Sequence, residues 1–309
     1  MTHPIRLGIV GLGKIARDQH LPAIAADPRF RLMAVADPKA ALDSVPSYSS
    51  LTEMLAAQPD LDAISFCTPP AGRHAIALEA ILAGKHVMLE KPPAATVTAA
   101  EHLIAVAAMQ RVTLFTTWHS REAAAVEQAR AWLAEATITA VRVDWREDIR
   151  RWHPGQNWIL EAGGFGVFDP GINGLSILTR ILPRPIVLDA AHFVVPQARH
   201  APIAAALTMQ SCGVPIRARF DFRNEGDECW TITVETAEGC LALTEGGARL
   251  SIDRTRISVD TANREYARLY DRFAMLIACR ESDVDLAPIQ LVADAFLVAE
   301  TVSGEAITF

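Results

Sequence analysis

The sequence predicts a two-domain α/β protein, with an N-terminal doubly wound parallel sheet and a C-terminal α+β domain built on an open, mostly antiparallel sheet. Three observations predict this fold class. A glycine-rich turn follows the first apolar run, strand-like and helix-like stretches then alternate to about residue 117, and later apolar runs mostly follow one another without helices. Alternating strands and helices are typical of a parallel sheet that is covered on both faces. Strands that follow one another without helices are typical of an antiparallel sheet. We therefore expect domains over residues 1–118 and 119–309.

Length and composition agree with this division and exclude several classes of protein. The 309 residues exceed the usual size of a single core, and the net charge of −7 without a basic block argues against nucleic acid or an anionic membrane as partner. No charged leader precedes the first strand and no run of eighteen apolar residues occurs, so we expect an unanchored cytoplasmic protein. The five cysteines are scattered without a C-x-x-C pair, which favours reduced thiols, and the histidines lack metal-ligand spacing, so we expect no metal.

The first strand, residues 5–10, leads into the turn G-x-G-x-x-A. Gly11 allows a tight turn, Gly13 lets backbone N–H groups, including those near Lys14 and Ile15, approach a pyrophosphate, and Ala16 seats the next helix against the strand. Glycine clusters also make ordinary turns. In this context the pattern favours a Rossmann dinucleotide-binding domain.

Asp37 follows the second strand, residues 31–36, about twenty residues after the glycines. A carboxylate at this position can accept the ribose hydroxyls of an adenosine and repels a 2′-phosphate. We therefore expect NAD as the preferred cofactor, with NADP possible because Lys39 lies nearby in the sequence.

The other elements of the first domain follow in order. Ser50 with Glu53 forms a capping box, and Gly84 is placed to end a helix. Ligands of such sheets bind beyond the carboxyl ends of the strands, so the glycine turn, Asp37, Thr68-Pro69 and Glu90-Lys91 should line one crevice. The expected strands are 63–67, 86–89 and 113–116, and the expected helices are 14–26, 50–57, 72–83 and 98–108.

The second domain should begin with a helix over 123–134, a strand over 138–145 and a tryptophan-rich loop. A short helix is expected near Asp169, and two helices over 262–279 and 289–302 should close the chain. Further strands are expected over 186–195, 203–210, 215–222, 229–235, 240–243 and 248–252.

Two residues have the chemistry of a site. Lys91 ends a buried strand and precedes a proline that restricts the chain, so its ammonium should be held at the crevice, although a strand-ending lysine is often simply solvated. Asp169 is placed as an N-cap before Pro170, and shares a helical face with Asn173 at i+4. Capping alone would account for Asp169, but not for the three neighbouring glycines.

These stretches resemble the glucose-fructose oxidoreductase, inositol dehydrogenase and MocA family across nearly the whole chain. Its E-K-P motif matches Glu90-Lys91-Pro92, and its G-G-G…D-x-G-x-H motif matches residues 163–173 except that Asn173 replaces the histidine. An amide cannot accept a proton at neutral pH, so the resemblance leaves Lys91 or Asp169 as the base. We favour Asp169 as base and Lys91 as a hydrogen-bonding partner of the developing oxyanion, with Asn173 orienting hydroxyls.

The segments L-E-K-P-P-A-A-T, W-R-E-D-I-R-R-W-H-P-G and V-F-D-P-G-I-N-G-L most resemble the bacterial aldose 1-dehydrogenases of this family that act on L-arabinose and D-galactose. The resemblance implies oxidation of the anomeric hydroxyl of an aldopyranose to its lactone, and a possible homodimer through the open sheet. It also implies sugar contacts, with Trp152 as an apolar face, from Lys91, His119, Glu147, Trp152, Asp169 and Asn173. The implied cofactor contacts are Gly11, Gly13, Lys14, Ile15, Asp37, Thr68, Pro69, Glu90 and Lys91.

Four alternatives remain open at this point. The enzyme could oxidise a ring hydroxyl of an inositol or modified sugar, or the chain could be a non-catalytic sugar or nucleotide sensor. His119 and Glu147 could form a structural hydrogen-bonded pair and bind no sugar. Trp152, together with Trp158, could simply fill the interdomain loop.

Overall fold

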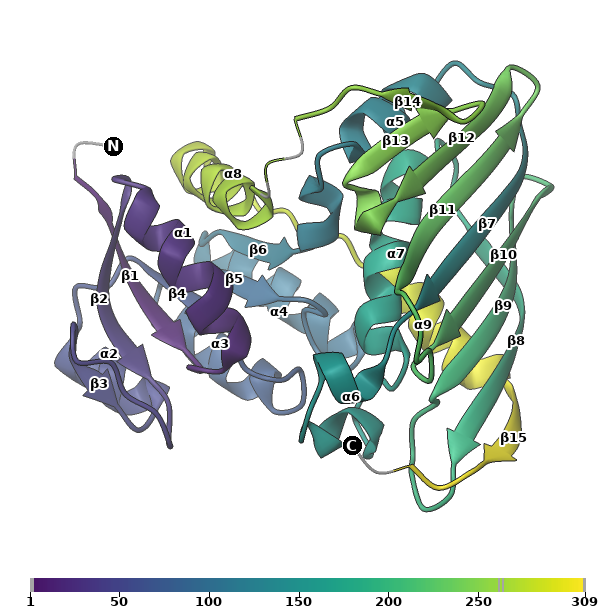
Figure 1. Cartoon of the computed structure of the whole chain (residues 1–309). Coiled ribbons are helices and arrows are strands. Elements are labelled where there is room, and N and C mark those ends of the chain that lie inside the picture. The colour runs from purple at the N-terminus through teal and green to yellow at the C-terminus, as the bar shows by residue number, and fades with distance from the viewer. Residues whose placement is uncertain (1–2, 261, 263, 308–309) are drawn as a thin grey trace. The chain divides into compact units, whose positions relative to one another are not determined.

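A computed structural model describes residues 3–260, 262 and 264–307, and it divides into two compact units (Figure 1). The first unit contains the chain up to His119 together with Tyr266–Leu286. The second contains Ser120–Glu265 and the chain from Ala287 onward.

The first unit is built on a six-stranded sheet in the order β3-β2-β1-β4-β5-β6, and every pairing in it is parallel. This confirms the predicted Rossmann sheet. The strand order reverses direction between β1 and β4, which is where such sheets bind ligands. The strands are β1 (Ile5–Val10), β2 (Phe30–Ala36), β3 (Ser47–Tyr48), β4 (Ala63–Phe66), β5 (His86–Glu90) and β6 (Leu114–Thr117).

The helices of this unit begin and end close to the predicted positions. Ser50 caps α2 by accepting the N–H of Glu53 at 3.2 Å, and Gly84 at φ +72° ends α3. The Glu53 carboxylate bonds the N–H of Ser49, one residue before the cap, so the capping box is shifted by one position. The expected helix over 14–26 contains a π-helical turn, η1 (Ala16–His20), before α1 (Leu21–Ala26). The others are α2 (Leu51–Ala57), α3 (Arg73–Leu82) and α4 (Val97–Gln110).

Helix α8 (Glu265–Cys279) packs in the first unit, although residues 119–309 were expected to form the second domain. Its buried side chains, including Tyr270 and Phe273, join Ile9, Ala16 and Phe30 in one core. The opposite core contains residues of α2, α3 and α4. Both faces of the sheet are therefore covered, and a helix from much later in the chain completes one of them. Residue 263 of the predicted helix 262–279 lies outside the described residues.

The second unit contains a nine-stranded sheet within the described residues, in the order β14-β13-β12-β11-β7-β10-β9-β8-β15. Its pairings are antiparallel except for β10 with β7 and β15 with β8, so the prediction of an open, mostly antiparallel sheet is confirmed. The strands are β7 (Ile138–Arg146), β8 (Val187–Pro196), β9 (Ala204–Ser211), β10 (Val214–Asp221), β11 (Cys229–Thr236), β12 (Gly239–Thr244), β13 (Arg249–Ile252), β14 (Thr255–Ile257) and β15 (Glu300–Gly304).

The end of the chain corrects one prediction. Helix α9 (Ala287–Val298) stops before residue 302, and β15 follows it as an edge strand parallel to β8. The apolar run in this region fits a helix and a strand equally well, which explains the error. The other helices of this unit are α5 (Val126–Leu133), α6 (Ile149–Trp152) and α7 (Phe168–Ile181), with short 3-10 turns at Asn157–Leu160 and Glu245–Gly247. A further 3-10 turn, His119–Glu122, begins at the last residue of the first unit's N-terminal segment. No helix among the described residues is long and apolar enough to cross a bilayer.

Two glycines let α7 lie close against the sheet. A Cβ at Gly171 would lie 2.7 Å from the Phe220 ring, and one at Gly174 would lie 2.7 Å from the Trp145 ring. The helix begins at Phe168, so the prediction that Asp169 is the N-cap is wrong. Asp169 lies in the first helical turn, where a carboxylate still interacts favourably with the helix dipole.

Candidate active site

The glycine turn after β1 has the shape expected of a phosphate-binding turn. Gly11 adopts φ +91°, and a Cβ there would lie 3.0 Å from backbone and side-chain atoms of Cys67 and Thr68. A Cβ at Gly13 would meet nothing within 4 Å, so this side of the turn is open. Ala16 is buried in the core. Only a residue without a side chain fits at Gly11, and the backbone at Gly13 is accessible to a ligand.

Asp37, at the end of β2, holds this turn. Its Oδ2 accepts the N–H of Leu12 at 2.8 Å, and its Oδ1 accepts those of Lys39 and Ala40 at 2.8 and 2.9 Å. Burial opposes ionisation, but these backbone donors and the nearby Arg17 outweigh it and hold the pKa of Asp37 below its ordinary value. The carboxylate is therefore ionised at neutral pH and anchored to the glycine turn.

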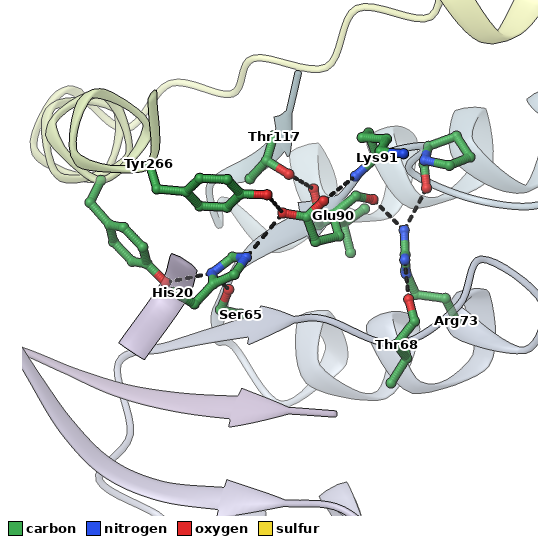
Figure 2. A network of polar contacts seen from close by, with 11 residues as sticks. His20, Ser65, Thr68, Arg73, Glu90, Lys91, Thr117 and Tyr266 are labelled. Atoms are coloured by element: carbon green, nitrogen blue, oxygen red, sulfur yellow. Dashed lines mark hydrogen bonds and ion pairs between the residues drawn. The ribbon is translucent and has the colours of Figure 1, made fainter. Parts of the chain in front are cut away.

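A buried arginine connects the loops that follow β4 and β5. The Arg73 guanidinium, on a residue 2% exposed, donates to the carbonyl oxygens of Thr68, Glu90 and Pro92 (Figure 2). Through these three bonds, Arg73 binds the carbonyls on both sides of Lys91 and connects that loop to Thr68. The peptide bond between Lys91 and Pro92 is cis. The Thr68 hydroxyl is buried and has no hydrogen-bond partner among the described residues, which fits a group that bonds a ligand.

Glu90 supports Lys91 from the other side. Its carboxylate accepts the backbone N–H of Lys91 at 3.1 Å, the Tyr266 hydroxyl at 2.9 Å and Nε2 of His20 at 3.0 Å (Figure 2). Burial raises the pKa of a carboxyl, but His20, His119 and Tyr266 outweigh it, and the pKa of Glu90 falls to about 2. Glu90 is thus a buried carboxylate, permanently charged in the physiological range.

His20 completes this network from the end of the π-helical turn. Its Nδ1 lies 2.8 Å from the Tyr270 hydroxyl and 3.3 Å from the Ser65 hydroxyl. Burial lowers the pKa of His20, but contacts with Cys67, Tyr270 and Glu90 raise it more, so it lies well above the ordinary value. The His119 ring stacks on Tyr266 with centroids 5.8 Å apart. Two tyrosines of α8 therefore support the strand end that presents Lys91.

In the second unit, Glu147 lies just beyond the end of β7 and is 4% exposed. Its Oε2 accepts the indole N–H of Trp230 at 3.0 Å, and its Oε1 lies 3.4 Å from Nε2 of His153. The other ring nitrogen of His153 lies 3.9 Å from Oδ2 of Asp169. His153 is therefore flanked by two carboxylates.

Asp169 and Asn173 lie one turn apart on α7, as their spacing predicts. The Asp169 side chain is 13% exposed, and Asn173 is half-buried. Close packing explains the glycines before the helix, which helix capping by Asp169 does not explain. A Cβ at Gly164 would lie 2.3 Å from the carbonyls of Trp158 and Ile159, and one at Gly166 would lie 2.2 Å from that of Pro202. Glycines thus let the loop pack tightly enough to start α7 at this place.

Trp152 belongs to an aromatic surface in the same unit. Its ring centroid lies 5.5 Å from that of Trp230, which in turn stacks on Trp145 at 6.2 Å. Its indole N–H donates to Glu228 at 3.3 Å, and the side chain is 37% exposed. Trp152 therefore presents a partly exposed indole next to Trp230, the tryptophan that donates to Glu147.

The structure brings the predicted site residues together in two groups. The carboxyl edge of the first sheet carries the glycine turn with Lys14 and Ile15, Asp37, Thr68-Pro69 and Glu90-Lys91, and His119 follows β6 in the same unit. The second unit gathers Glu147, Trp152, Asp169 and Asn173. Lys14 also forms an ion pair with Asp18 on its own helix.

Sequence reasoning missed four residues that make polar contacts in these groups: His20, Arg73, His153 and Trp230. His153 stands in the tryptophan-rich loop that the sequence predicts, but it was considered only as a metal ligand. The contacts of Arg73 with Glu90, of His20 with Glu90 and of Trp230 with Glu147 span 17, 70 and 83 positions, so no local pattern predicts them. Among the described residues, no group of three or more His, Cys, Asp or Glu side chains is arranged to hold a metal ion.

Comparison with known proteins shows the family to which this chain belongs. Residues 5–117 match the GFO_IDH_MocA oxidoreductase family with its NAD-binding Rossmann fold. The chain is also 47% identical to galactose 1-dehydrogenase of Pseudomonas fluorescens over 98% of both sequences. It belongs to this oxidoreductase family, which confirms the resemblance seen in the sequence.

Solved structures agree. The crystal structure of D-galactose-1-dehydrogenase from Rhizobium etli matches with a TM-score of 0.95 and 49% identity, covering 100% of this chain and 99% of the other. A 3-ketoreductase from Actinomadura kijaniata, crystallised with NADP, matches with a TM-score of 0.85 over 98% of this chain, but at 19% identity this likeness shows the fold alone.

Proposed function

We propose that the protein oxidises the anomeric C1 hydroxyl of an aldopyranose, L-arabinose or D-galactose, to the aldonolactone with NAD as hydride acceptor. The observation that carries the proposal is the near full-length similarity to galactose 1-dehydrogenases. Lys91 at a carboxyl strand end and Asp169 on α7 supply the polar chemistry that the reaction needs.

The nicotinamide ring, when bound, supplies the hydride acceptor for the reaction. The open backbone at Gly13, the Thr68 hydroxyl without a partner and the Asp37 carboxylate fit a dinucleotide along the carboxyl edge of the sheet. Lys14 and Ile15 directly follow Gly13 in the chain, and Pro69 directly follows Thr68. The Glu90 carboxylate is engaged by three donors, so its part in cofactor binding acts through the placement of Lys91.

Asp169 takes the proton from the anomeric hydroxyl while the C1 hydride leaves, and Lys91 donates a hydrogen bond to the oxygen as its negative charge develops. Asn173 orients a neighbouring hydroxyl because an amide both donates and accepts. His119 and Glu147 bind other hydroxyls, and Trp152 covers an apolar face of the sugar. The family resemblance supports these three assignments.

The activity is tested by nicotinamide reduction with purified protein, using NAD and NADP against L-arabinose, D-galactose, D-glucose, D-xylose and myo-inositol. We expect rapid reduction with arabinose or galactose and little with glucose or xylose. Turnover of myo-inositol alone would move the reaction to a ring hydroxyl. Cofactor binding without turnover of any of these would favour the sensor.

We further expect a cytoplasmic enzyme, since its five cysteines are all free. A homodimer through the outer face of the nine-stranded sheet is also expected from the family resemblance. Light scattering on a size-exclusion column measures the oligomeric state, and a monomer at micromolar concentration would contradict the dimer.

A further inference from the structure

His153 lies beside the two candidate carboxylates of the second unit, with its side chain 16% exposed and one ring nitrogen buried and unsatisfied. Its Nδ1 has no hydrogen-bond partner among the described residues and lies 3.9 Å from Oδ2 of Asp169. Leaving a buried polar atom without a partner destabilises the folded protein. Such an atom at a candidate active site calls for a functional explanation.

The surroundings of His153 determine which nitrogen carries the proton. Nε2 faces the buried Glu147 carboxylate at 3.4 Å, and Glu147 is itself fixed by the indole N–H of Trp230. A carboxylate favours a protonated nitrogen next to it, so the neutral ring carries its hydrogen on Nε2. Nδ1 is then the unprotonated nitrogen, and its lone pair is available to Asp169.

The backbone also holds the ring in place. The N–H of His153 bonds the carbonyl of Ile149 at 2.8 Å and so ends helix α6, whose start is capped by Asp148. The N–H of Ile149 bonds the carbonyl of Phe222, and the Phe222 ring meets the imidazole edge-on with centroids 5.5 Å apart. The position of the ring is therefore set by the fold.

From this geometry we infer that His153 accepts the proton that Asp169 removes from the substrate hydroxyl, so that Asp169 and His153 act as a proton-transfer pair. The inference rests on the proposed function. In the first step the O–H bond of the anomeric hydroxyl breaks, its proton goes to Asp169, and the C1 hydride goes to the nicotinamide. In the second step the proton passes from Asp169 to Nδ1 of His153, directly or through one water, which regenerates the carboxylate. The resulting imidazolium lies between the carboxylates of Asp169 and Glu147.

This pair also accounts for the asparagine at position 173. An amide one turn along α7 cannot accept a proton, whereas an imidazole from the loop after α6 can. The proton acceptor beside Asp169 is thus supplied by a different element of the same unit.

Kinetics of His153→Ala and His153→Gln test the inference. We expect kcat to fall about 100-fold in both, with a smaller change in the KM for the sugar, and added imidazole to restore part of the rate of His153→Ala only. Combined with Asp169→Asn, either change should add little further loss, because the two residues act in one step. His192→Ala is the matched control, since that exposed histidine lies 3.4 Å from Glu300 in the same unit and should keep full activity.

Near-normal kcat in His153→Gln, a loss confined to KM, or losses that multiply in the double variant would overturn the inference. A readout without turnover separates it from the proposed function. Nitrogen-15 NMR of the histidine ring in the wild-type protein should show a protonated Nε2 and an unprotonated Nδ1 at His153, and Glu147→Gln should change this tautomer. A proton on Nδ1 in the wild-type protein would exclude transfer from Asp169, whereas failure to oxidise any sugar would overturn the proposed function and leave this tautomer measurement valid.

Discussion

Some side chains of the candidate site combine a structural contact with a predicted chemical role. Asp37 is predicted to bind ribose, yet its carboxylate also holds the glycine turn through Leu12 and the following loop through Lys39 and Ala40. Asp169 is predicted to be a base, and it lies in the first turn of α7 next to His153. Substitutions at these positions therefore have separable structural and chemical effects.

Replacing Asp169 by Asn should lower kcat by about 10²- to 10⁴-fold, because an amide cannot take up the hydroxyl proton. The KM for the sugar should change less, since Asn keeps the size of Asp and one of its acceptor oxygens. Steady-state kinetics with saturating NAD measure both quantities. Near-normal turnover of this variant would show that the base is another group.

Replacing Asp37 by Ser should shift the ratio of kcat/KM values toward NADP, because it removes the charge that repels a 2′-phosphate. Arg17, whose charge already acts on Asp37, would then favour the 2′-phosphate. The absolute efficiency with NAD should also fall, since the glycine turn loses its acceptor for the Leu12 N–H. An unchanged ratio would mean that Asp37 does not discriminate between the ribose of NAD and the 2′-phosphorylated ribose of NADP.

At the scale of elements, the site depends on helices and loops held by close contacts. Alternating apolar runs were enough to predict most strands of both sheets, because burial on a regular period is a local signal. The edge strand β15 and the start of α7 at Phe168 were not predicted, since tertiary contacts decide both. The glycines of the G-G-F-G stretch were visible in the sequence, but the carbonyls that they pack against lie elsewhere in the chain.

Gly174→Ala should destabilise the protein by about 1–3 kcal/mol, because the added methyl group would lie 2.7 Å from the Trp145 ring. The higher helix propensity of alanine offsets part of this cost. Thermal unfolding of the variant measures the loss. Gly226→Ala is the control, because a Cβ there meets nothing within 4 Å; equal Tm values for the two variants would contradict the packing argument.

Arg73→Met should weaken NAD binding about tenfold or more, because the loops that carry Thr68 and Lys91 lose their shared anchor. Arg73→Lys should restore only part of the affinity, since an ammonium cannot reach three carbonyls with the geometry of a guanidinium. Fluorescence titration with NAD gives the Kd. The control Arg272→Met removes an arginine that pairs with Asp283 at 3.2 Å in the same unit; similar Kd values for both methionine variants would remove the specific role of Arg73.

At the scale of the whole molecule, the sequence predicted two domains and the family, but not the path by which α8 joins the first unit. That helix brings Tyr266 and Tyr270 to the His20–Glu90 pair, across 176 and 250 positions of sequence. No local pattern reports contacts of such separation. The motif residues were therefore predictable, and the buried network that supports Lys91 was not.

This network should make stability depend on pH in two directions. The pKa of Glu90 falls from 4.5 to about 2 on folding, so its contribution is complete above pH 4.5 and is lost as the pH falls toward 2. The pKa of His20 rises well above 6.5, so its contribution is complete below pH 6.5 and is lost as the pH rises through the folded value. The pair should therefore stabilise the protein most between these two limits.

Urea unfolding midpoints of the wild-type protein and of His20→Gln, measured across the pH range, test this dependence. The difference between the two proteins should be largest between pH 4.5 and 6.5 and should shrink at alkaline pH. A constant difference at all pH values would show that His20 is not charged in the folded protein.

Oxidation at the anomeric carbon moves one specific hydrogen, which can be followed with an isotope. Purified protein is incubated with NAD and with L-arabinose or D-galactose carrying deuterium at C1, and the reduced cofactor is analysed by mass spectrometry. We predict that the deuterium appears in the reduced nicotinamide and that the sugar product is the lactone. Reduced cofactor without deuterium would place the oxidation at another carbon and contradict the proposed function.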